Sequence, residues 1–214
     1  MASTRALVAV SAGLQVPSST RLLADRLVAA TERHLRDAGI DPATTVIELR
    51  DHAQDLSNNL LTGFASPTLQ AAIDQVTGGD GLIVASPIFN ASYSGLFKTF
   101  FDVIEHGSLE GRPVLLAATG DTARHSLALE HALRPLFTYL GADTVRTAVY
   151  AASEDWGRSG VPADGSLVQR IDRAARELAA AMAVREPQVR ADAYGDPEPF
   201  EQMLRDLEPR QAGD

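Results

Sequence analysis

Short apolar runs of strand length alternate along the chain with longer stretches in which apolar residues recur every three or four positions. We expect the apolar runs to form strands at residues 5–10, 44–49, 81–85, 113–118 and 145–151. Helical patterns follow them at residues 18–37, 66–76, 92–106, 122–140 and 165–184. This alternation is typical of βαβ units. It predicts an α/β protein of three layers, with a doubly wound, five-stranded parallel sheet between two layers of helices.

One of the helical patterns contains a proline at a position that a regular helix does not accept. Pro135 lies within residues 122–140, lacks the N–H that would bond the carbonyl of His131, and crowds that carbonyl with its ring. A kink or a π-bulge near His131 would relieve the conflict. A plain proline-bent helix is an equally good interpretation.

The composition is that of an ordinary globular chain, with 45% hydrophobic and 22% charged residues among 214. The net charge of −9 argues against sequence-independent binding of nucleic acid phosphates. No apolar run approaches the length of a membrane span, and the first residues lack the features of a secretory signal. The chain has no cysteine, which excludes disulfides, thiolate catalysis and cysteine-ligated metals. These properties predict a cytoplasmic protein.

The last residues differ from the rest in charge and proline content. Residues 187–214 hold seven acids against three arginines and four of the 11 prolines, so we expect a domain at 1–186 and an acidic C-terminal extension at 187–214. Apolar side chains in the extension follow the spacing of one helix face, at Phe200, Met203, Leu204 and Leu207. A helix this short is marginal alone, so the pattern predicts docking on the domain or on a neighbouring subunit. A chance pattern in a solvated tail is the alternative.

In a doubly wound sheet, ligands bind beyond the carboxyl ends of the strands, in the loops that follow them. The first such loop, residues 11–20, carries hydroxyl side chains around the start of a helix, at Ser11, Ser18, Ser19 and Thr20. The N–H groups of a helix start, with hydroxyls beside them, favour a phosphate. The loop lacks the glycines of a dinucleotide fingerprint, so it suits a single terminal phosphate. Helix capping by Ser18 or Ser19 without any ligand is the alternative.

The loops after the third and fourth strands combine apolar, amide and hydroxyl groups. Residues 86–95 read SPIFNASYSG, a surface on which an aromatic ring could lie while backbone N–H groups bond its edge. Gly120, within the TGDT loop at 119–122, lets the backbone approach a ligand closely. An ordinary strand-to-helix turn capped by Ser92 is the alternative for residues 86–95.

Neither a metal site nor a nucleophilic triad is expected. The five histidines, at 34, 52, 106, 125 and 131, show no paired metal spacing, and no G-x-S-x-G elbow is present. We therefore assign no catalytic side chain. His34 is expected on the solvated face of the first helix. Trp156 follows the fifth strand, where it either packs at the surface or covers a ligand.

Two segments resemble a known family. SPIFNASYSGLFKTFFD at 86–102 looks like the flavin loop and following helix of the NADPH-dependent FMN reductases, and TGDTARHSLALEHALRP at 119–135 resembles their next segment. The resemblance covers roughly residues 5–184. It implies a flavodoxin-like sheet of order 2-1-3-4-5, FMN as cofactor and NADPH or NADH as hydride donor. It also implies a homodimer or homotetramer that supplies reduced flavin to a partner monooxygenase.

The resemblance places each cofactor contact on a loop residue. The FMN phosphate would be held by Ser11, Ser18, Ser19 and Thr20. The isoalloxazine ring would be lined by Pro87, Ile88, Phe89 and Asn90, with Ser92 nearby. Its pyrimidine edge would face Thr119, Gly120 and Asp121. The chain departs from the G-S-x-R phosphate loop of many relatives, because it has Gln15 and no arginine there, and Asp121 stands where many have a second glycine.

Other functions stay open on this fold. One is a quinone or azo-compound reductase that holds FMN tightly. Another is a flavodoxin-like electron carrier without a nicotinamide site. Such a carrier normally sandwiches its flavin between aromatic residues of two loops, and the absence of Trp or Tyr directly after Thr119 disfavours it. A third is a non-flavin interaction protein that retains the fold.

Overall fold

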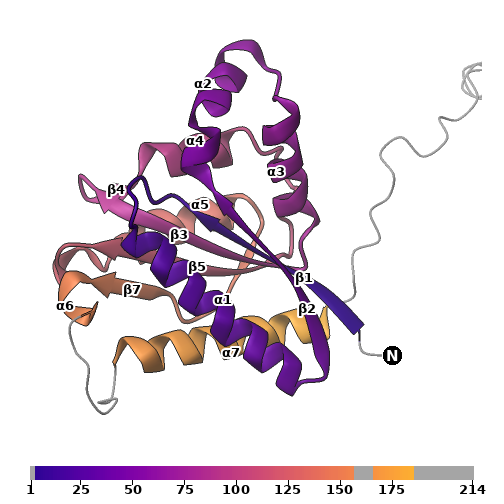
Figure 1. Ribbon diagram of the computed structural model, residues 1–214, viewed down its shortest axis with the longest axis vertical. Helices are drawn as coiled ribbons and strands as arrows, with labels where there is room; N and C mark the ends of the chain where they lie inside the picture. Colours follow the sequence, from indigo (N-terminus) through magenta and orange to yellow (C-terminus); the bar gives the residue numbers. More distant parts are fainter. Residues whose placement is uncertain (1–2, 157–165, 186–214) are drawn as a thin grey trace, which may run out of the picture.

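The computed structural model describes residues 3–156 and 166–185. Its centre is a sheet of order β2-β1-β3-β5-β6, whose neighbouring strands are all parallel (Figure 1). The bounds are β1 (Ser3–Ser11), β2 (Ile40–Glu48), β3 (Gly81–Phe89), β5 (Pro113–Gly120) and β6 (Asp143–Thr144). In terms of the five expected strands this is the order 2-1-3-4-5, so the predicted flavodoxin-like α/β fold is confirmed. The acidic extension at 187–214, with its helix pattern, lies outside the described residues.

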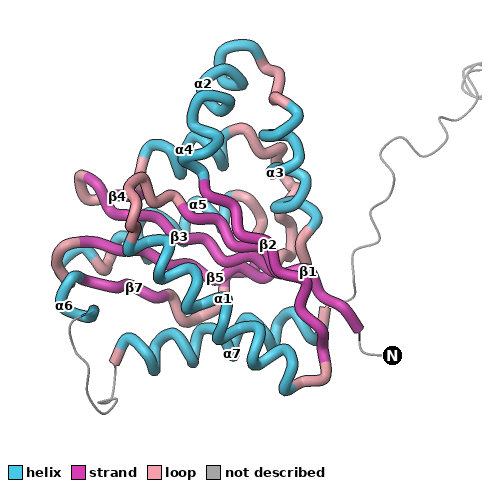
Figure 2. Tube along the Cα trace, in the orientation of Figure 1, coloured by secondary structure: helices cyan, strands magenta, loops and turns pink. Residues whose placement is uncertain are grey.

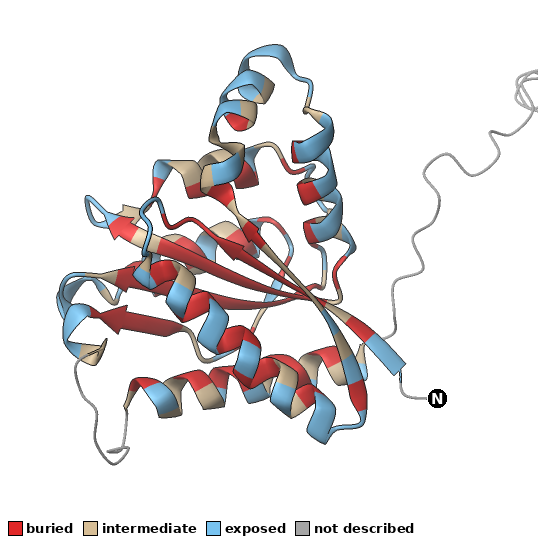
Figure 3. Cartoon of the chain, viewed as in Figure 1, coloured by how far each residue is buried: buried red, intermediate tan, exposed pale blue. Residues whose placement is uncertain are grey.

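Helices cover both faces of the sheet because alternate residues of each inner strand point to opposite sides. Leu7 and Ile83 face α1 (Ser19–Asp37) and α7 (Leu167–Val184). Val8 and Val84 belong to the opposite layer, whose helices are α2 (Ala53–Thr62), α3 (Pro67–Gly78), α4 (Gly95–Asp102) and α5 (Arg134–Tyr139). Figure 3 shows the strands as a buried band between the two layers. No helix in the part of the chain that the structure describes is long and apolar enough to cross a membrane.

The expected fifth strand is divided in two. β6 pairs with the start of β5, whereas β7 (Val149–Ala152) pairs with its end, at Ala117–Gly120. The residues between them belong to neither strand, and the side chain of Arg134 donates to the carbonyls of Val145 and Arg146 there. Since both pieces pair with β5 in parallel, the division keeps the predicted strand order.

The helix expected at 122–140 is largely replaced by other structure. A 3₁₀ turn spans Ala123–His125, a π-helix spans Leu129–Leu133, and only α5 is α-helical. The N–H of Arg134 donates to the carbonyl of Leu129, five residues back, which is the π-helical bond. The π-bulge interpretation of Pro135 is therefore confirmed, because the extra residue relieves the clash with the proline ring.

A two-residue hairpin precedes α4, which begins three residues later than expected. β4 (Ser92–Tyr93) folds back antiparallel on the end of β3, and Asn90 and Ala91 form the turn with φ values of 48° and 69°. Such left-handed turns match the twist of the strands that they join. Ser94, rather than Ser92, caps α4 by accepting from the N–H of Phe97 at 3.2 Å.

We expected His34 on the solvated face of the first helix, and this was wrong. His34 packs between α1 and α7, the two helices of its layer. Its Nε2 lies 3.0 Å from Oδ1 of Asp172 on α7, and the imidazole is only 20% exposed. Sequence spacing along α1 gave no sign of this contact because Asp172 lies far along the chain.

Candidate functional site

The carboxyl ends of β1, β3, β5 and β7, with the residues that follow them, lie at one edge of the sheet (Figure 2). They enclose a pocket of about 440 Å³, a size typical of cofactor sites. Most of the predicted site residues line it: Ser18, Ser19, Thr20, Pro87, Ile88, Phe89, Thr119, Gly120 and Asp121. Ser11, Asn90 and Ser92 do not. The remaining lining residues, which were not assigned to the site, are Gly13, Leu14, Gln15, Pro17, Ser153 and Trp156.

The start of α1 forms the polar end of the pocket. Ser18 is the N-cap, and its hydroxyl accepts from the N–H of Arg21 at 3.2 Å, so the capping interpretation holds for this residue. The first turn of a helix leaves other N–H groups without acceptors inside the helix. Ser19 and Thr20 occupy that turn, and both line the pocket. The helix start therefore offers an anion both backbone and hydroxyl donors.

Gly13 allows the first loop to close tightly against the helix start. A Cβ at this position would lie 2.0 Å from Oγ of Ser18, which no side chain tolerates. Ser11 lies one step deeper. It is 1% exposed, and its Oγ is 3.5 Å from the N–H of Gly13. Ser11 thus supports the loop from below instead of lining the pocket.

A buried pair of hydroxyls joins the first and third loops beneath the pocket. Oγ1 of Thr20 and Oγ1 of Thr119 are 2.7 Å apart, and the two residues are 2% and 4% exposed. Each threonine satisfies the other, so neither hydroxyl is left unpaired in a buried place. The contact fixes the start of α1 against the end of β5.

The second loop supplies the apolar side of the pocket. Pro87, Ile88 and Phe89 line it, and Phe89 is 48% exposed at the mouth. The Ser86 hydroxyl donates to the carbonyl of Pro87 at 2.9 Å and accepts from the N–H of Ser94 at 3.0 Å. These bonds hold the hairpin in place. Asn90, at its turn, extends beyond the pocket.

The third loop rests on Tyr150 of β7. The Tyr150 hydroxyl donates to the carbonyl of Thr122 at 2.8 Å, and a Cβ on Gly120 would lie 2.2 Å from that hydroxyl. Burial raises the pKa of Tyr150, and the charges of Asp121 and Asp155 raise it further. Among the described residues that line the pocket, Asp121 alone is charged.

Two residues near the pocket, Trp156 and Arg50, were not assigned to the site from the sequence. Trp156 both lines the pocket and packs against the core of the α1–α7 layer, with Arg26 5.1 Å above its ring. Arg50, in the 3₁₀ helix Leu49–His52 that follows β2, donates to the carbonyl of Gln15 at 3.2 Å and pairs with Glu48. The contact places a guanidinium, itself paired with Glu48 and Asp51, beside the first loop, which has no charged residue of its own. The sequence could have indicated this contact only through the pairing of β1 with β2, which brings the segments after the two strands together.

Comparison with known proteins agrees with this geometry. The sequence profile of the NADPH-dependent FMN reductases matches residues 6–157. The chain belongs to that family. This chain is 42% identical to an FMN reductase (NADPH) of Pseudomonas aeruginosa, over 84% of this chain and 93% of the relative. An NADH-dependent FMN reductase, SfnF, of Pseudomonas putida is 36% identical over 77% of this chain and 88% of its own.

A solved structure shows the same arrangement. An oxidoreductase from Corynebacterium diphtheriae superposes with a TM-score of 0.81 at 41% identity, over 86% of this chain and 99% of the other. Family and structure together make this chain an NAD(P)H:FMN oxidoreductase, with FMN and NAD(P)H as its cofactors. The pocket fits a flavin mononucleotide, since donors for one phosphate stand at one end and an apolar wall at the other.

Proposed function

We propose that this chain reduces FMN with NADPH or NADH in the pocket described above, and that it hands the reduced flavin to a flavin-dependent monooxygenase. The observation that carries the proposal is the convergence of a capped helix start with an apolar wall at the carboxyl edge of the sheet. Ser18, Ser19 and Thr20 would hold the phosphate. Pro87, Ile88 and Phe89 would line the ring, and Thr119, Gly120 and Asp121 would face its pyrimidine edge.

The protein's part in the reaction is binding and orientation. When bound, FMN supplies the chemistry by accepting a hydride from the nicotinamide at its N5 atom. The apolar side chains at Pro87, Ile88 and Trp156 would exclude water from the reacting rings. The hydroxyl and backbone donors of the first loop would fix the flavin at its far end, so that one ring face is presented to the donor. No side chain is required as a general acid or base.

The outer residues of the predicted set have supporting places in this proposal. Ser11 would hold Gly13 from below, Asn90 would shape the hairpin, and Ser92 would close it against Phe89. Their replacement would weaken FMN binding through the loops, without the loss of a direct contact.

A phosphate-specific variant tests the site. Ser19→Ala removes a hydroxyl from the helix start without disturbing the Ser18 cap or the buried Thr20 pair. We expect FMN affinity to fall about ten- to hundredfold, the value of one hydrogen bond to a charged group, and riboflavin affinity to stay unchanged. Ser57→Ala, on an exposed part of α2, is the control. Equal losses for FMN and riboflavin would contradict the assigned phosphate position.

The setting of the reaction is also proposed. A homodimer or homotetramer in the cytoplasm, working with a separate monooxygenase, agrees with the composition and with the family resemblance of the sequence. Sedimentation of the purified chain, alone and with a candidate monooxygenase, measures both associations. A strictly monomeric, isolated species that still reduces FMN at full rate would refute the oligomer.

A further inference from the structure

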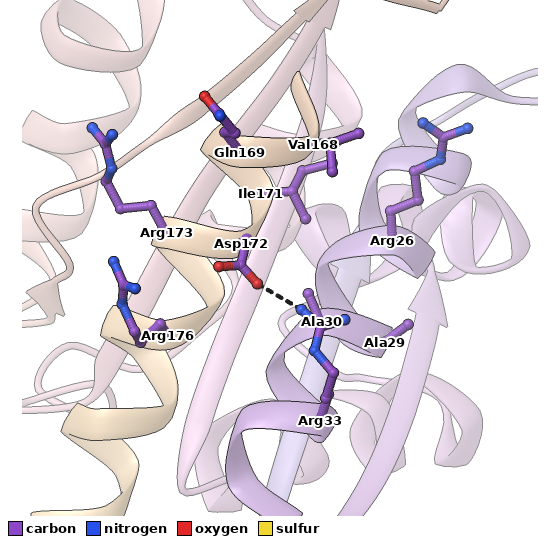
Figure 4. Close-up of a pocket in the computed structure, with 10 residues that line it drawn as sticks. All are labelled: Arg26, Ala29, Ala30, Arg33, Val168, Gln169, Ile171, Asp172, Arg173 and Arg176. Carbon is purple, nitrogen blue, oxygen red and sulfur yellow. Dashed lines mark hydrogen bonds and ion pairs between the residues drawn. The ribbon is translucent and has the colours of Figure 1, made fainter. Parts of the chain in front are cut away.

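The outer side of the α1–α7 layer carries a groove that the flavin site does not use. It has a volume of about 860 Å³, and its floor is formed by small and apolar side chains. These are Ala29, Ala30, Val168 and Ile171. Val168 is 59% exposed, which is unusual for a residue between two packed helices. Figure 4 shows Val168 and Ile171 projecting from α7 toward α1. The groove is therefore an uncovered apolar strip on the face away from the sheet.

Arginines surround this strip. Arg26 and Arg33 come from α1, and Arg173 and Arg176 from α7, against a single acid, Asp172 (Figure 4). Asp172 is already engaged, because Arg33 pairs with it at 2.6 Å and His34 at 3.0 Å. Within residues 3–156 and 166–185, no ion pair joins Arg173 or Arg176 to an acid. The groove thus has an apolar floor and rims on which four arginines face a single acid, in a chain whose net charge is −9.

A surface of this kind matches an amphipathic acidic helix, which places its apolar face on the floor and its acids beside the rims. The chain contains such a segment. Residues 198–208 carry four acids against one arginine, and Phe200, Met203, Leu204 and Leu207 share one helix face. We propose that residues 198–208 of the acidic extension dock in the α1–α7 groove of the same molecule.

The length of chain is sufficient. α7 ends at Val184, and 13 residues separate Arg185 from Pro199. Those residues span up to about 43 Å when extended. The groove begins about 14 Å back along α7, at the level of Arg176, because each helical residue rises about 1.5 Å. Tethering also gives the segment a high effective concentration at the groove, so that modest contacts suffice to hold it there.

The absence of cysteine provides a direct test in the full chain. One cysteine replaces Ala29 in the groove and a second replaces Gln202 in the acidic segment. In the matched control, Ser57→Cys on α2 replaces the groove cysteine. Under mild oxidation we expect the intrachain disulfide to form at least tenfold faster for the Ala29→Cys pair than for the Ser57→Cys pair. Equal rates in the two proteins would overturn the proposal, and so would a disulfide that joins two chains.

Charge reversal provides the second arm. Arg173→Glu with Arg176→Glu, added to the Ala29→Cys pair, should slow disulfide formation at least fivefold. Arg36→Glu, outside the groove on α1, should leave the rate unchanged. Trp156 is the single tryptophan, and Arg26 of the groove lies 5.1 Å above its ring, so in the flavin-free chain its fluorescence reports changes at Arg26. High salt should change that fluorescence in the native chain and not in the double reversal. A salt response of equal size in both would contradict docking through charge.

Discussion

At Gly13 the pocket depends on a missing side chain. Gly13→Ala would place a Cβ against the hydroxyl that caps α1, so either the loop or the cap must move. We expect the loss of the cap to lower the unfolding free energy by about 1 kcal/mol and FMN affinity to fall at least tenfold. Gly95→Ala is the matched control, because nothing lies within 4 Å of its Cβ position. Flavin fluorescence quenching and urea unfolding measure the two effects, and equal behaviour of both variants would contradict the argument.

Tyr150 is expected to limit the stability of the fold at alkaline pH. Burial raises its pKa above the ordinary tyrosine value of about 10, with Asp121 and Asp155 adding to the effect. A group whose pKa is higher in the folded state contributes stability that is present below the unfolded pKa and is lost as pH rises through the folded pKa. Stability should therefore fall above about pH 10.

Tyr150→Phe tests this limit. The variant should lose about 1 kcal/mol at neutral pH, because the donor to Thr122 is removed, and should show a flatter alkaline limb. Tyr139→Phe, whose ring is 73% exposed, is the control. Thermal melts between pH 7 and pH 11 distinguish the variants, and an unchanged alkaline limb in Tyr150→Phe would contradict the assignment.

At this scale the sequence was informative where a residue's role depends on its immediate neighbours. The cap at Ser18 and the place of residues 87–89 along the pocket follow from local order and were predicted. The Thr20–Thr119 pair and the Arg50 contact join residues far apart in the chain. Single-sequence patterns contain no information on such contacts, so these could not be predicted.

Among the elements, α5 depends on one arginine. Arg134 pairs with Glu130 at 2.6 Å and donates to Thr144 Oγ1 at 2.7 Å and to the carbonyls of Val145 and Arg146. Its hydrogen bond lowers the pKa of Glu130, so that carboxylate stays charged for the pair. The guanidinium thereby joins the π-helix to the segment that divides the fifth strand.

Arg134→Lys should lower the unfolding free energy by about 1–2 kcal/mol, because an ammonium group cannot reach all of these acceptors. Arg36→Lys is the control, since Arg36 is 57% exposed and its one ion pair within the described residues is to Glu32 of its own helix, a contact worth about 0.5 kcal/mol or less. Urea unfolding of both variants measures the two changes in unfolding free energy. Equal losses would show that the bridging contacts add nothing.

The elements were predictable to different degrees for physical reasons. The inner strands at 81–85 and 113–118 are apolar on both faces, which few other structures allow. The helix at 122–140 was mispredicted because its apolar periodicity continues through 3₁₀, π and α segments alike. Pro135 was the local signal that regular helix could not continue. α2 was missed because only Leu56 in it is buried, which gives a weak stripe.

For the whole molecule, cofactor binding and stability are linked. A ligand that binds only the folded state stabilises it by mass action, by about 2.7 kcal/mol at one hundred times its dissociation constant. FMN should therefore raise the melting temperature in a concentration-dependent manner. Riboflavin at the same concentration should raise it less, because the donors at the start of α1 have no phosphate to bind. Equal shifts by the two flavins in a thermal melt would contradict the proposed binding mode.

The topology of the whole molecule was the most predictable feature. Strand–helix alternation together with right-handed crossovers leaves few arrangements, and the resemblance selected the one observed. The groove between α1 and α7 was not predicted, because it depends on which faces of two helices meet.

The hydroxyl contact between Thr20 and Thr119 has a consequence for how the pocket responds to its ligand. The two loops that would hold opposite ends of a flavin are joined to each other by this contact within the chain itself. A ligand therefore does not have to order them separately, and the entropy that it loses on binding is mostly its own. A fragment that represents only the ring, such as lumichrome, should bind at the apolar side of the pocket, and ribitol phosphate should bind at the start of α1. The binding of one fragment should not change the affinity for the other. In this proposal the two ends of the pocket are held at a fixed separation by the protein itself, not by the bound flavin.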